Sequence, residues 1–279
     1  MAATAFQIQY RQEFVSAFEQ RQSMLSASVT REAVMKGNQA TFLVAGSGSA
    51  TAVTRGVNGL IPARNDDLNQ YTATLVEWHD LVQRTGFNLF ASQGDGRRIM
   101  QETTMGVINR KMDQDILAEL ANGTQDAGAA ATLSLSKVMH AVAILGNADV
   151  PISEEDKMFG VISPAGYAYL MQTKEFASAD YVEVKPFSGP IRTFRRWAGI
   201  NWIMHPNLSG AAGAAELCYI YHRDAIGQAV NTGEMDMKVG VDEEQNYSYA
   251  RCSVFMGSKL LQNTGVVKIT HDGSGYAAT

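Results

Sequence analysis

The sequence contains few cysteines and no long apolar run. Its 279 residues include only Cys218 and Cys252, which lie far apart in apolar, strand-like stretches, so two buried free thiols are expected rather than a disulfide. No apolar run reaches the ~18 residues of a membrane-spanning helix, and the first residues, MAATAFQIQYRQ, do not resemble a signal peptide. We therefore expect a globular protein made in a cytoplasm, with no membrane partner.

Positive charge is also scarce. The chain has 23 Lys and Arg against 28 Asp and Glu, which gives a net charge of −5. A protein that reads nucleic acid derives its affinity from clustered Lys and Arg, so any contact with nucleic acid should be local and non-specific. With 46% hydrophobic residues, the chain can bury one large core or two smaller ones.

The motifs that support catalysis or cofactor binding are missing or incomplete. The stretch FLVAGSGSAT (42–51) places Gly46 and Gly48 after an expected strand, but it lacks the third glycine and the following helix of a dinucleotide site. The triplet at 222–224 imitates a kinase catalytic loop, yet Asn231 stands at the wrong distance and the sequence has no Asp-Phe-Gly. We therefore expect no cofactor.

Nucleophilic and metal chemistry lack candidates as well. The sequence has no G-x-S-x-G elbow, and its acidic clusters, at 66–67 and 154–156, fall in expected loops where solvated charge is the usual interpretation. The five histidines, at positions 79, 140, 205, 222 and 271, stand singly, without metal-ligand spacing. The sequence therefore predicts neither catalytic nor metal-binding residues, and a protein that is not an enzyme.

One long helix is expected in the middle of the chain, from Gly94 to Gly123. Asp95 is the expected N-cap, and a length of about 26 residues predicts a rod of roughly 39 Å. Apolar residues recur at helical spacing, and four of them form the stripe that we expect to pack: Ile108, Met112, Ile116 and Leu120. The charged residues are assigned to a solvated face: Glu102, Arg110, Lys111, Asp113, Asp115 and Glu119.

The residues before this helix predict an arm and a projecting hairpin. Residues 10–25 have the spacing of an amphipathic helix, and Thr30–Lys36 and Thr41–Val44 are expected to be extended. About 25 glycine-broken residues separate the second of these from the alternating run Gln70–Trp78. Because loops beyond ~12 to 15 residues are uncommon in compact domains unless they have a function, we expect residues 41–84 to form a long hairpin that projects.

The residues after the long helix predict an α/β region and then antiparallel strands. Ser134 should cap a helix through Leu145, Met158–Ile162 should be a buried strand, and Ser163-Pro164 should begin a second helix. Short strands are expected at 181–185, 191–195, 201–204 and 217–221, and a helix at Asp224–Val230. Alternating residues from Met235 to Val241 and the stretches 247–261 and 266–270 predict the final strands.

This order of elements is similar to that of the major capsid proteins of tailed phages. Local stretches resemble the same family: MKGNQATF (35–42), MGVINRKMDQDILAEL (105–120), MFGVISPAGYAYLM (158–171) and CYIYHRDAIGQAV (218–230). The resemblance spans residues 10–270 and implies an α+β, Hong Kong 97-like fold. It implies an N-terminal arm at 1–40, an extended β-hairpin loop at 41–84, a peripheral domain with a long spine helix at 85–129 and 234–279, and an α/β axial domain at 130–233.

The resemblance also implies self-assembly into pentamers and hexamers of an icosahedral head, so the protein would be a virion component assembled in the host bacterial cytoplasm. Members that weld their shells covalently use a lysine on the extended loop, but no lysine occurs between Lys36 and Lys111. A non-covalent shell is therefore expected. Four charged loop residues are candidates for contacts between subunits: Arg55, Arg64, Asp66 and Asp67.

Other partners and other functions follow from the same resemblance. A separate scaffolding protein is expected because the sequence begins almost directly with the arm, and a portal, decoration proteins and packaged double-stranded DNA are further candidate partners. The alternative on the same fold is an encapsulin-like compartment shell that binds cargo enzymes. The third hypothesis, an α/β enzyme built on residues 130–233, has no convergent catalytic set to support it.

Overall fold

The computed structural model describes residues 22–34, 36–48, 50–64, 66–86, 96–177, 194–231, 233 and 236–276. Three predicted features fall wholly or mostly outside these residues: the amphipathic helix at 10–25, the Asp95 cap and the strand at 181–185. The strand expected at 191–195 lies only partly within them and overlaps β7 (Phe194–Trp197).

The chain forms two compact units. The small unit contains Met1–Ser23, Glu77–Met112 and Gly233–Phe255, and the large unit contains Met24–Val76, Asp113–Thr232 and Met256–Thr279. Helix α2 (Gly96–Ala121) and strand β12 (Tyr247–Leu260) contribute residues to both. Each unit therefore combines segments that are far apart in the sequence.

A six-stranded sheet lies at the centre of the large unit, with the strand order β5-β13-β9-β6-β8-β7. Strand β6 pairs in parallel with β8 and antiparallel with β9, and β13 lies between β9 and β5. The remaining strands of this sheet are β5 (Gln125–Asp126), β6 (Met158–Ile162), β8 (Ile200–Met204), β9 (Glu216–His222) and β13 (Val266–His271). The strand predicted at 158–162 is confirmed, and those predicted at 201–204 and 217–221 are each longer by one or two residues.

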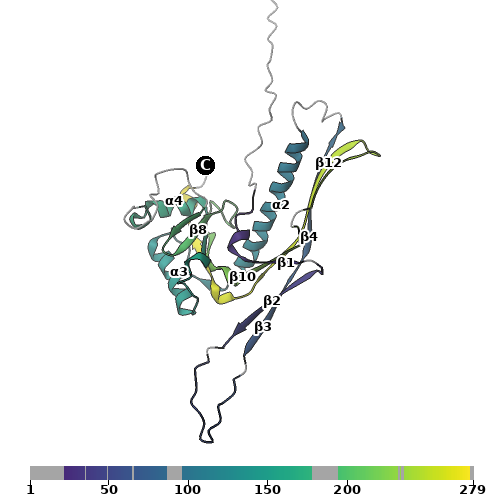
Figure 1. Ribbon diagram of the computed structural model, residues 1–279. Helices are drawn as coiled ribbons and strands as arrows, with labels where there is room; N and C mark the ends of the chain where they lie inside the picture. Colours follow the sequence, from purple (N-terminus) through teal and green to yellow (C-terminus); the bar gives the residue numbers. More distant parts are fainter. Residues whose placement is uncertain are drawn as a thin grey trace, which may run out of the picture. The chain divides into compact units, whose positions relative to one another are not determined.

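Helices α3 (Leu135–Asn147), α4 (Pro164–Gln172) and α5 (Lys174–Ala177) belong to the same unit (Figure 1). The predicted start of α4 is confirmed, because Ser163 Oγ accepts a hydrogen bond from the Gly166 N–H at 2.9 Å and proline occupies the first turn. One continuous core joins these helices to the sheet, and its largest fully buried side chains include Phe176, Trp202, Tyr219 and Tyr221.

Strand β10 (Ile226–Asn231) replaces the helix predicted at Asp224–Val230. Only a short 3₁₀ turn, η3 (Arg223–Ala225), precedes it. Strand β10 pairs in parallel with β1 (Thr30–Val34) and antiparallel with the Met256–Leu260 half of β12, so it is a central strand with all residues from Ile226 to Val230 buried. The helix prediction was wrong because the apolar spacing of 226, 229 and 230 fits a helical stripe equally well, whereas burial on both faces favours a strand.

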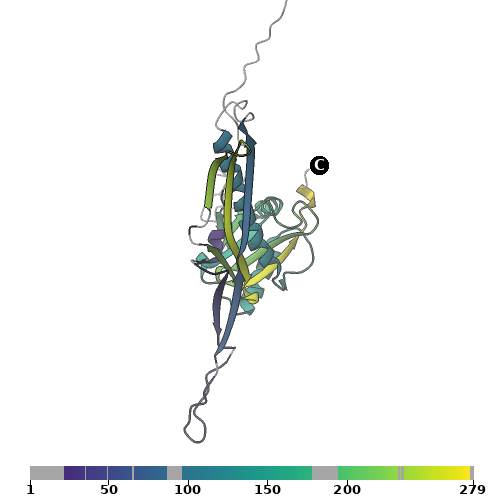
Figure 2. The ribbon, with the colours of Figure 1, turned by 90° about the vertical axis from the view of Figure 1, so that its right-hand side faces the viewer.

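Strands β2 (Gln39–Gly46) and β3 (Asp67–Thr74) form a two-stranded hairpin, in a register from Gln39 opposite Thr74 to Gly46 opposite Asp67. A hairpin was predicted here, but its predicted end at residue 84 was wrong, because residues 76–85 form a separate strand that pairs with β12. At its base, Ala40 and Ala73 pack with Ala229 of β10. A Cβ on Gly227 would lie 2.9 Å from the Phe42 ring, so a glycine is needed here for the hairpin to approach β10 this closely. The loop between β2 and β3 projects past the ends of these two strands (Figures 1 and 2).

In the small unit, β4 (Val76–Thr85) and β11 (Asp236–Asp242) both pair with β12. The first half of α2 runs beside β4 and β12 (Figures 1 and 2). Lys111 Nζ lies 3.9 Å from the centre of the Trp78 ring, a cation–π contact, and His79 Nδ1 is 2.8 Å from Ser253 Oγ. The register places Met237, Val239 and Val241 on one face of β11, as their alternation predicts, although both valines stay largely exposed.

Candidate assembly surfaces

The extended loop exposes apolar side chains that nothing in the described chain covers. Leu60 is 73% exposed and Val57 is 107% exposed relative to its reference value. A tight turn shapes the tip, because the Gly56 N–H donates to the Leu60 carbonyl at 3.0 Å and the Gly59 N–H donates to the Gly56 carbonyl at 2.9 Å. The other strongly exposed apolar residues of the hairpin and loop are Leu43, Val53, Ile61 and Leu68. Such a set is typical of a surface covered by a partner.

The four charged residues predicted for contacts between subunits lie in two different environments. Arg64 Nη2 is 2.6 Å from Asp66 Oδ1, so these two charges neutralise each other within one loop. Asp67 begins β3 and accepts from Asn69 Nδ2 at 3.3 Å. Arg55, by contrast, donates to the Gly59 carbonyl at 3.3 Å and pairs with no carboxylate among the described residues. It is the cation of the loop tip.

The four residues predicted for the apolar stripe of the long helix are all buried. Ile108 and Met112 belong to the part of α2 in the small unit, and Ile116 and Leu120 belong to the part in the large unit, where both join the main core. Thr103 Oγ1 donates to the Ile99 carbonyl at 3.0 Å, so it satisfies its hydroxyl within the helix. The stripe therefore faces the interior of each unit in turn.

The sequence predicted that Asp113 lies on a solvated face of the helix, and this was wrong, because its side chain is fully buried. Its Oδ1 accepts from the Leu25 N–H and its Oδ2 from the Met24 N–H, both at 3.1 Å. His205 Nε2 is 3.3 Å from Oδ2, and His205 Nδ1 accepts from the Asn207 N–H at 3.2 Å. The ring proton must therefore be on Nε2 and point at the carboxylate. Asp113 thus fixes the backbone at residues 24–25 to α2 and β8.

The position of Asp113 on the helix could have predicted this burial. It lies four residues after the buried Asn109 and three before Ile116, which places it on the apolar stripe. A buried carboxylate costs free energy unless donors surround it, and the donors here come from residues 88, 89 and 92 positions away. The helical spacing was therefore visible in the sequence, but the partners were not.

A second buried polar cluster, Ser163, Glu216 and His271, has the residue types of a catalytic triad but not the geometry. The Ser163 hydroxyl donates to the Glu216 carboxylate rather than to a histidine, and Glu216 also accepts from the Ala212 N–H. His271 Nδ1 accepts from the Leu133 N–H at 3.0 Å. All three side chains are buried, so a substrate has no access to the serine. The cluster cross-links loops of the large unit.

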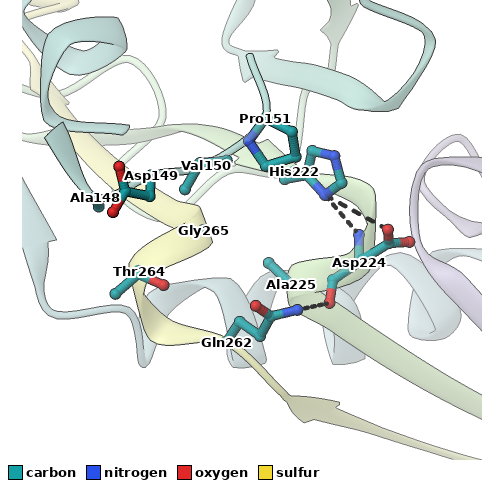
Figure 3. Close-up of a pocket in the computed structure, with 10 residues that line it drawn as sticks. All are labelled: Ala148, Asp149, Val150, Pro151, His222, Asp224, Ala225, Gln262, Thr264 and Gly265. Atoms are coloured by element: carbon teal, nitrogen blue, oxygen red, sulfur yellow. Dashed lines mark hydrogen bonds and ion pairs between the residues drawn. The ribbon is translucent and has the colours of Figure 1, made fainter. Parts of the chain in front are cut away.

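A small cavity of about 210 Å³ lies in the large unit (Figure 3). Its walls come from the turn after α3, from the β9–β10 connection and from η4 (Asn263–Gly265) with its preceding residue. His222 Nδ1 accepts from the Asp224 N–H at 3.3 Å, and burial lowers the pKa of His222, although Asp224 and Glu154 oppose that shift. Gln262 Nε2 donates to the Asp224 carbonyl at 3.3 Å, so the cavity floor is held in place.

Nowhere in the described part of the chain do three or more His, Cys, Asp or Glu side chains gather to hold a metal ion. No helix within the described ranges is both long and apolar enough to cross a membrane. Cys218 and Cys252 are both buried free thiols, as predicted, and burial raises the pKa of Cys218 to about 12.

The chain matches known proteins both as a sequence and as a fold. The model of a phage capsid protein family matches residues 2–273. The fold is similar to a solved structure from Mycobacterium phage Che8 (TM-score 0.75, 13% identity, covering 96% of this chain and 98% of that one). It is also similar to the capsid of cyanophage P-SCSP1u (TM-score 0.70, 13% identity, covering 96% of this chain and 93% of that one). The capsid of Ralstonia phage GP4 is similar to the same degree (TM-score 0.69, 14% identity, covering 96% of each chain).

A search of curated proteins finds no match to the sequence. The family match nevertheless covers nearly the whole chain, and it favours a phage shell over the encapsulin-like alternative. The family is a structural one, whose members self-assemble into oligomeric capsids, so the enzyme hypothesis is not supported. The chain therefore belongs to the phage capsid protein family: it has the Hong Kong 97-like fold and is a structural component of the virion, in the icosahedral shell of the head.

Proposed function

We propose that copies of this chain form pentamers and hexamers that enclose double-stranded DNA in the head of a tailed phage. The exposed apolar loop is the observation that carries the proposal. A two-stranded ribbon is marginally stable alone, and Val57 and Leu60 gain nothing from the fold of their own chain. Burial against a neighbouring copy would remove these side chains from water and order the loop.

The four-part organisation forms part of the proposal. In it, residues 1–40 act as the arm, 41–84 as the extended loop, 85–129 with 234–279 as the peripheral domain, and 130–233 as the axial domain. The buried stripe Ile108, Met112, Ile116 and Leu120 would keep the spine helix rigid during assembly. Arg55, Arg64, Asp66 and Asp67 are the loop charges available for contacts between subunits.

The shell is proposed to be non-covalent. The absence of lysine between Lys36 and Lys111 leaves the extended loop without the nucleophile that a covalent weld would need. With a net charge of −5, the protein would contact the packaged DNA locally and non-specifically. A scaffolding protein, a portal and decoration proteins are the further proposed partners, and assembly would take place in the host bacterial cytoplasm.

Expression of the chain alone and together with a candidate scaffolding protein tests this proposal. Mass measurement in solution and negative-stain microscopy should show rings or closed shells in at least one condition. A stable 30.3 kDa monomer in both would contradict the proposal. Purified particles boiled in detergent and reductant should give a single monomer band, whereas ladders that survive this treatment would contradict the non-covalent shell.

A further inference from the structure

The loop tip presents a single cation among apolar side chains. Arg55 is the only charged residue between positions 50 and 63, and its one hydrogen bond, to the Gly59 carbonyl at 3.3 Å, leaves most of the five guanidinium donors unused. Arg64 differs because Asp66 already neutralises it. If neighbouring copies bury the loop tip, Arg55 therefore needs acceptors that the loop itself does not provide.

The 210 Å³ cavity of the large unit offers such acceptors. Asp149 and Asp224 lie on opposite sides of it, with their carboxylates on its outer side, and no lysine or arginine lines it (Figure 3). Val150, Pro151 and Ala225 supply apolar wall that can pack against the methylene stem of an arginine. No residue of the extended loop lines this cavity in its own chain, so the proposed occupant is the loop of another copy.

The charges around the cavity favour a cation. Asp224 is partly neutralised, because Lys157 Nζ lies 3.4 Å from its Oδ2 and Thr30 Oγ1 donates to its Oδ1 at 3.1 Å. Lys157 also pairs with Glu154 at 2.9 Å, so one ammonium group is shared between two carboxylates. His222 adds no charge at neutral pH because burial lowers its pKa.

Asp149 stands at a helix end that favours a cation. It follows the C-terminus of α3 in a left-handed conformation, with φ 56°, and its N–H donates to the Gly146 carbonyl at 3.2 Å. The C-terminus of a helix carries partial negative charge, so an anion is unfavourable there and a cation is favourable. Within the described residues, no cationic side chain is paired with Asp149.

We propose that the Arg55 guanidinium of one copy docks at the edge of this cavity on a neighbouring copy and pairs with Asp149. Asp224 adds attraction from the far side of the cavity, and the Thr264 hydroxyl and Gln262 amide oxygen on its wall are further acceptors. The planar fork of arginine suits such a site better than lysine does. This inference rests on the proposed function, because it requires copies held side by side in a shell.

Charge reversal tests the pairing. Arg55→Glu and Asp149→Arg should each lower the yield of sedimenting shells by about tenfold or more, and the double variant should restore it to within about twofold of wild type. Glu243→Arg, which reverses an exposed acid in the β11–β12 turn, is the matched control and should assemble normally. Wild-type yields from Arg55→Glu, or a double variant that is not restored, would overturn the pairing.

A cysteine pair gives an independent readout. Shells of Arg55→Cys/Asp149→Cys, assembled in reductant and then oxidised, should give multimers on a non-reducing gel, whereas Arg55→Cys/Glu243→Cys shells should give monomers. The native thiols, both buried, should not react. Monomers from oxidised Arg55→Cys/Asp149→Cys shells would overturn the pairing but leave the proposed function intact. Failure of the wild-type chain to assemble would instead count against the proposed function.

Discussion

The core of the large unit and the extended loop contain the same kinds of apolar residue in opposite environments. Ile162 and Ile203 in the central sheet are fully buried, whereas Val57 and Leu60 at the loop tip lie in solvent. Burial of one such side chain stabilises a protein by about 1.5 to 3 kcal/mol. The core residues contribute this free energy to the fold of one copy, and the loop residues can contribute it only to assembly. Substitutions in the two regions should therefore separate folding from assembly.

The largest effect is expected for Ile108→Pro in α2, a substitution among the residues that are buried within one copy of the chain. Proline in a helix interior costs about 3 kcal/mol or more, and Ile108 is also a buried side chain. Since a whole protein is stabilised by only about 5 to 15 kcal/mol, we expect a strongly lowered Tm and no shells. Circular dichroism melts and sedimentation measure the two effects.

Val107→Ala is the matched control for this variant. Val107 is the preceding residue on α2 and is 37% exposed, and alanine is the best helix former. We expect its Tm to lie close to that of wild type and its shells to form. Normal shells from Ile108→Pro would contradict the proposed role of α2 as a rigid spine.

The second prediction concerns Val57→Ser and Leu60→Ser, two substitutions at the exposed loop tip. Each should leave the free energy of unfolding of the unassembled chain within about 0.5 kcal/mol of wild type, as is usual for surface substitutions. Each should weaken assembly by about 2 kcal/mol per copy if the side chain becomes buried there. The protein concentration needed for shells, measured by light scattering, should rise.

Leu43→Ser on the hairpin extends this experiment from the tip to the ribbon. Leu43 is 77% exposed on β2, while its neighbour Phe42 packs against β10. Phe42→Ser should therefore lower the Tm of the unassembled chain, whereas Leu43→Ser should affect assembly alone. Equal effects of the two substitutions on the Tm would mean that the two faces of the hairpin do not differ as the structure indicates.

Local spacing predicted the elements whose partners are near in sequence or whose pattern is unambiguous. The long helix, the hairpin, β6 and the start of α4 followed from helical spacing, alternation, an apolar run and the Ser163-Pro164 pair. Strand β10 did not, because its two neighbours, β1 and β12, come from the two ends of the described chain. A strand whose burial depends on such distant segments can have the same spacing as a helix.

The candidate site was predictable to a similar degree. The loop charges were found because the loop is long and lacks apolar periodicity, but the pairing of Arg64 with Asp66 depends on the bend between them. The cavity beside Asp149 could not be predicted, because its walls come from three segments far apart in the sequence: 148–151, His222 with 224–225, and Gln262 with 264–265. The burial of Asp113 could be predicted only from its position on the helix together with the distant N–H donors of residues 24–25.

The smallest expected effect is a dependence of stability on pH that arises in the buried core of the large unit. His271 is fully buried, with its ring 5.2 Å from that of Tyr169, and burial lowers its pKa, although Glu216 opposes the shift. The unfolded chain has an ordinary histidine pKa of about 6.5. As the pH falls through 6.5, the unfolded chain therefore takes up a proton that the folded chain does not, and the protein loses stability.

His271→Asn sharpens this prediction, because an asparagine Oδ1 can accept the Leu133 N–H in place of Nδ1. The wild-type Tm should fall by a few degrees between pH 7.5 and pH 5.5, and the variant should fall by less. His222, whose pKa burial also lowers, titrates in both proteins and cancels in the difference. Equal falls would mean that His271 accepts its proton as readily in the folded chain as in the unfolded one, and that the core around Glu216 is open to water. The loop variants Val57→Ser and Leu60→Ser should reproduce the wild-type pH dependence, since neither side chain touches this core.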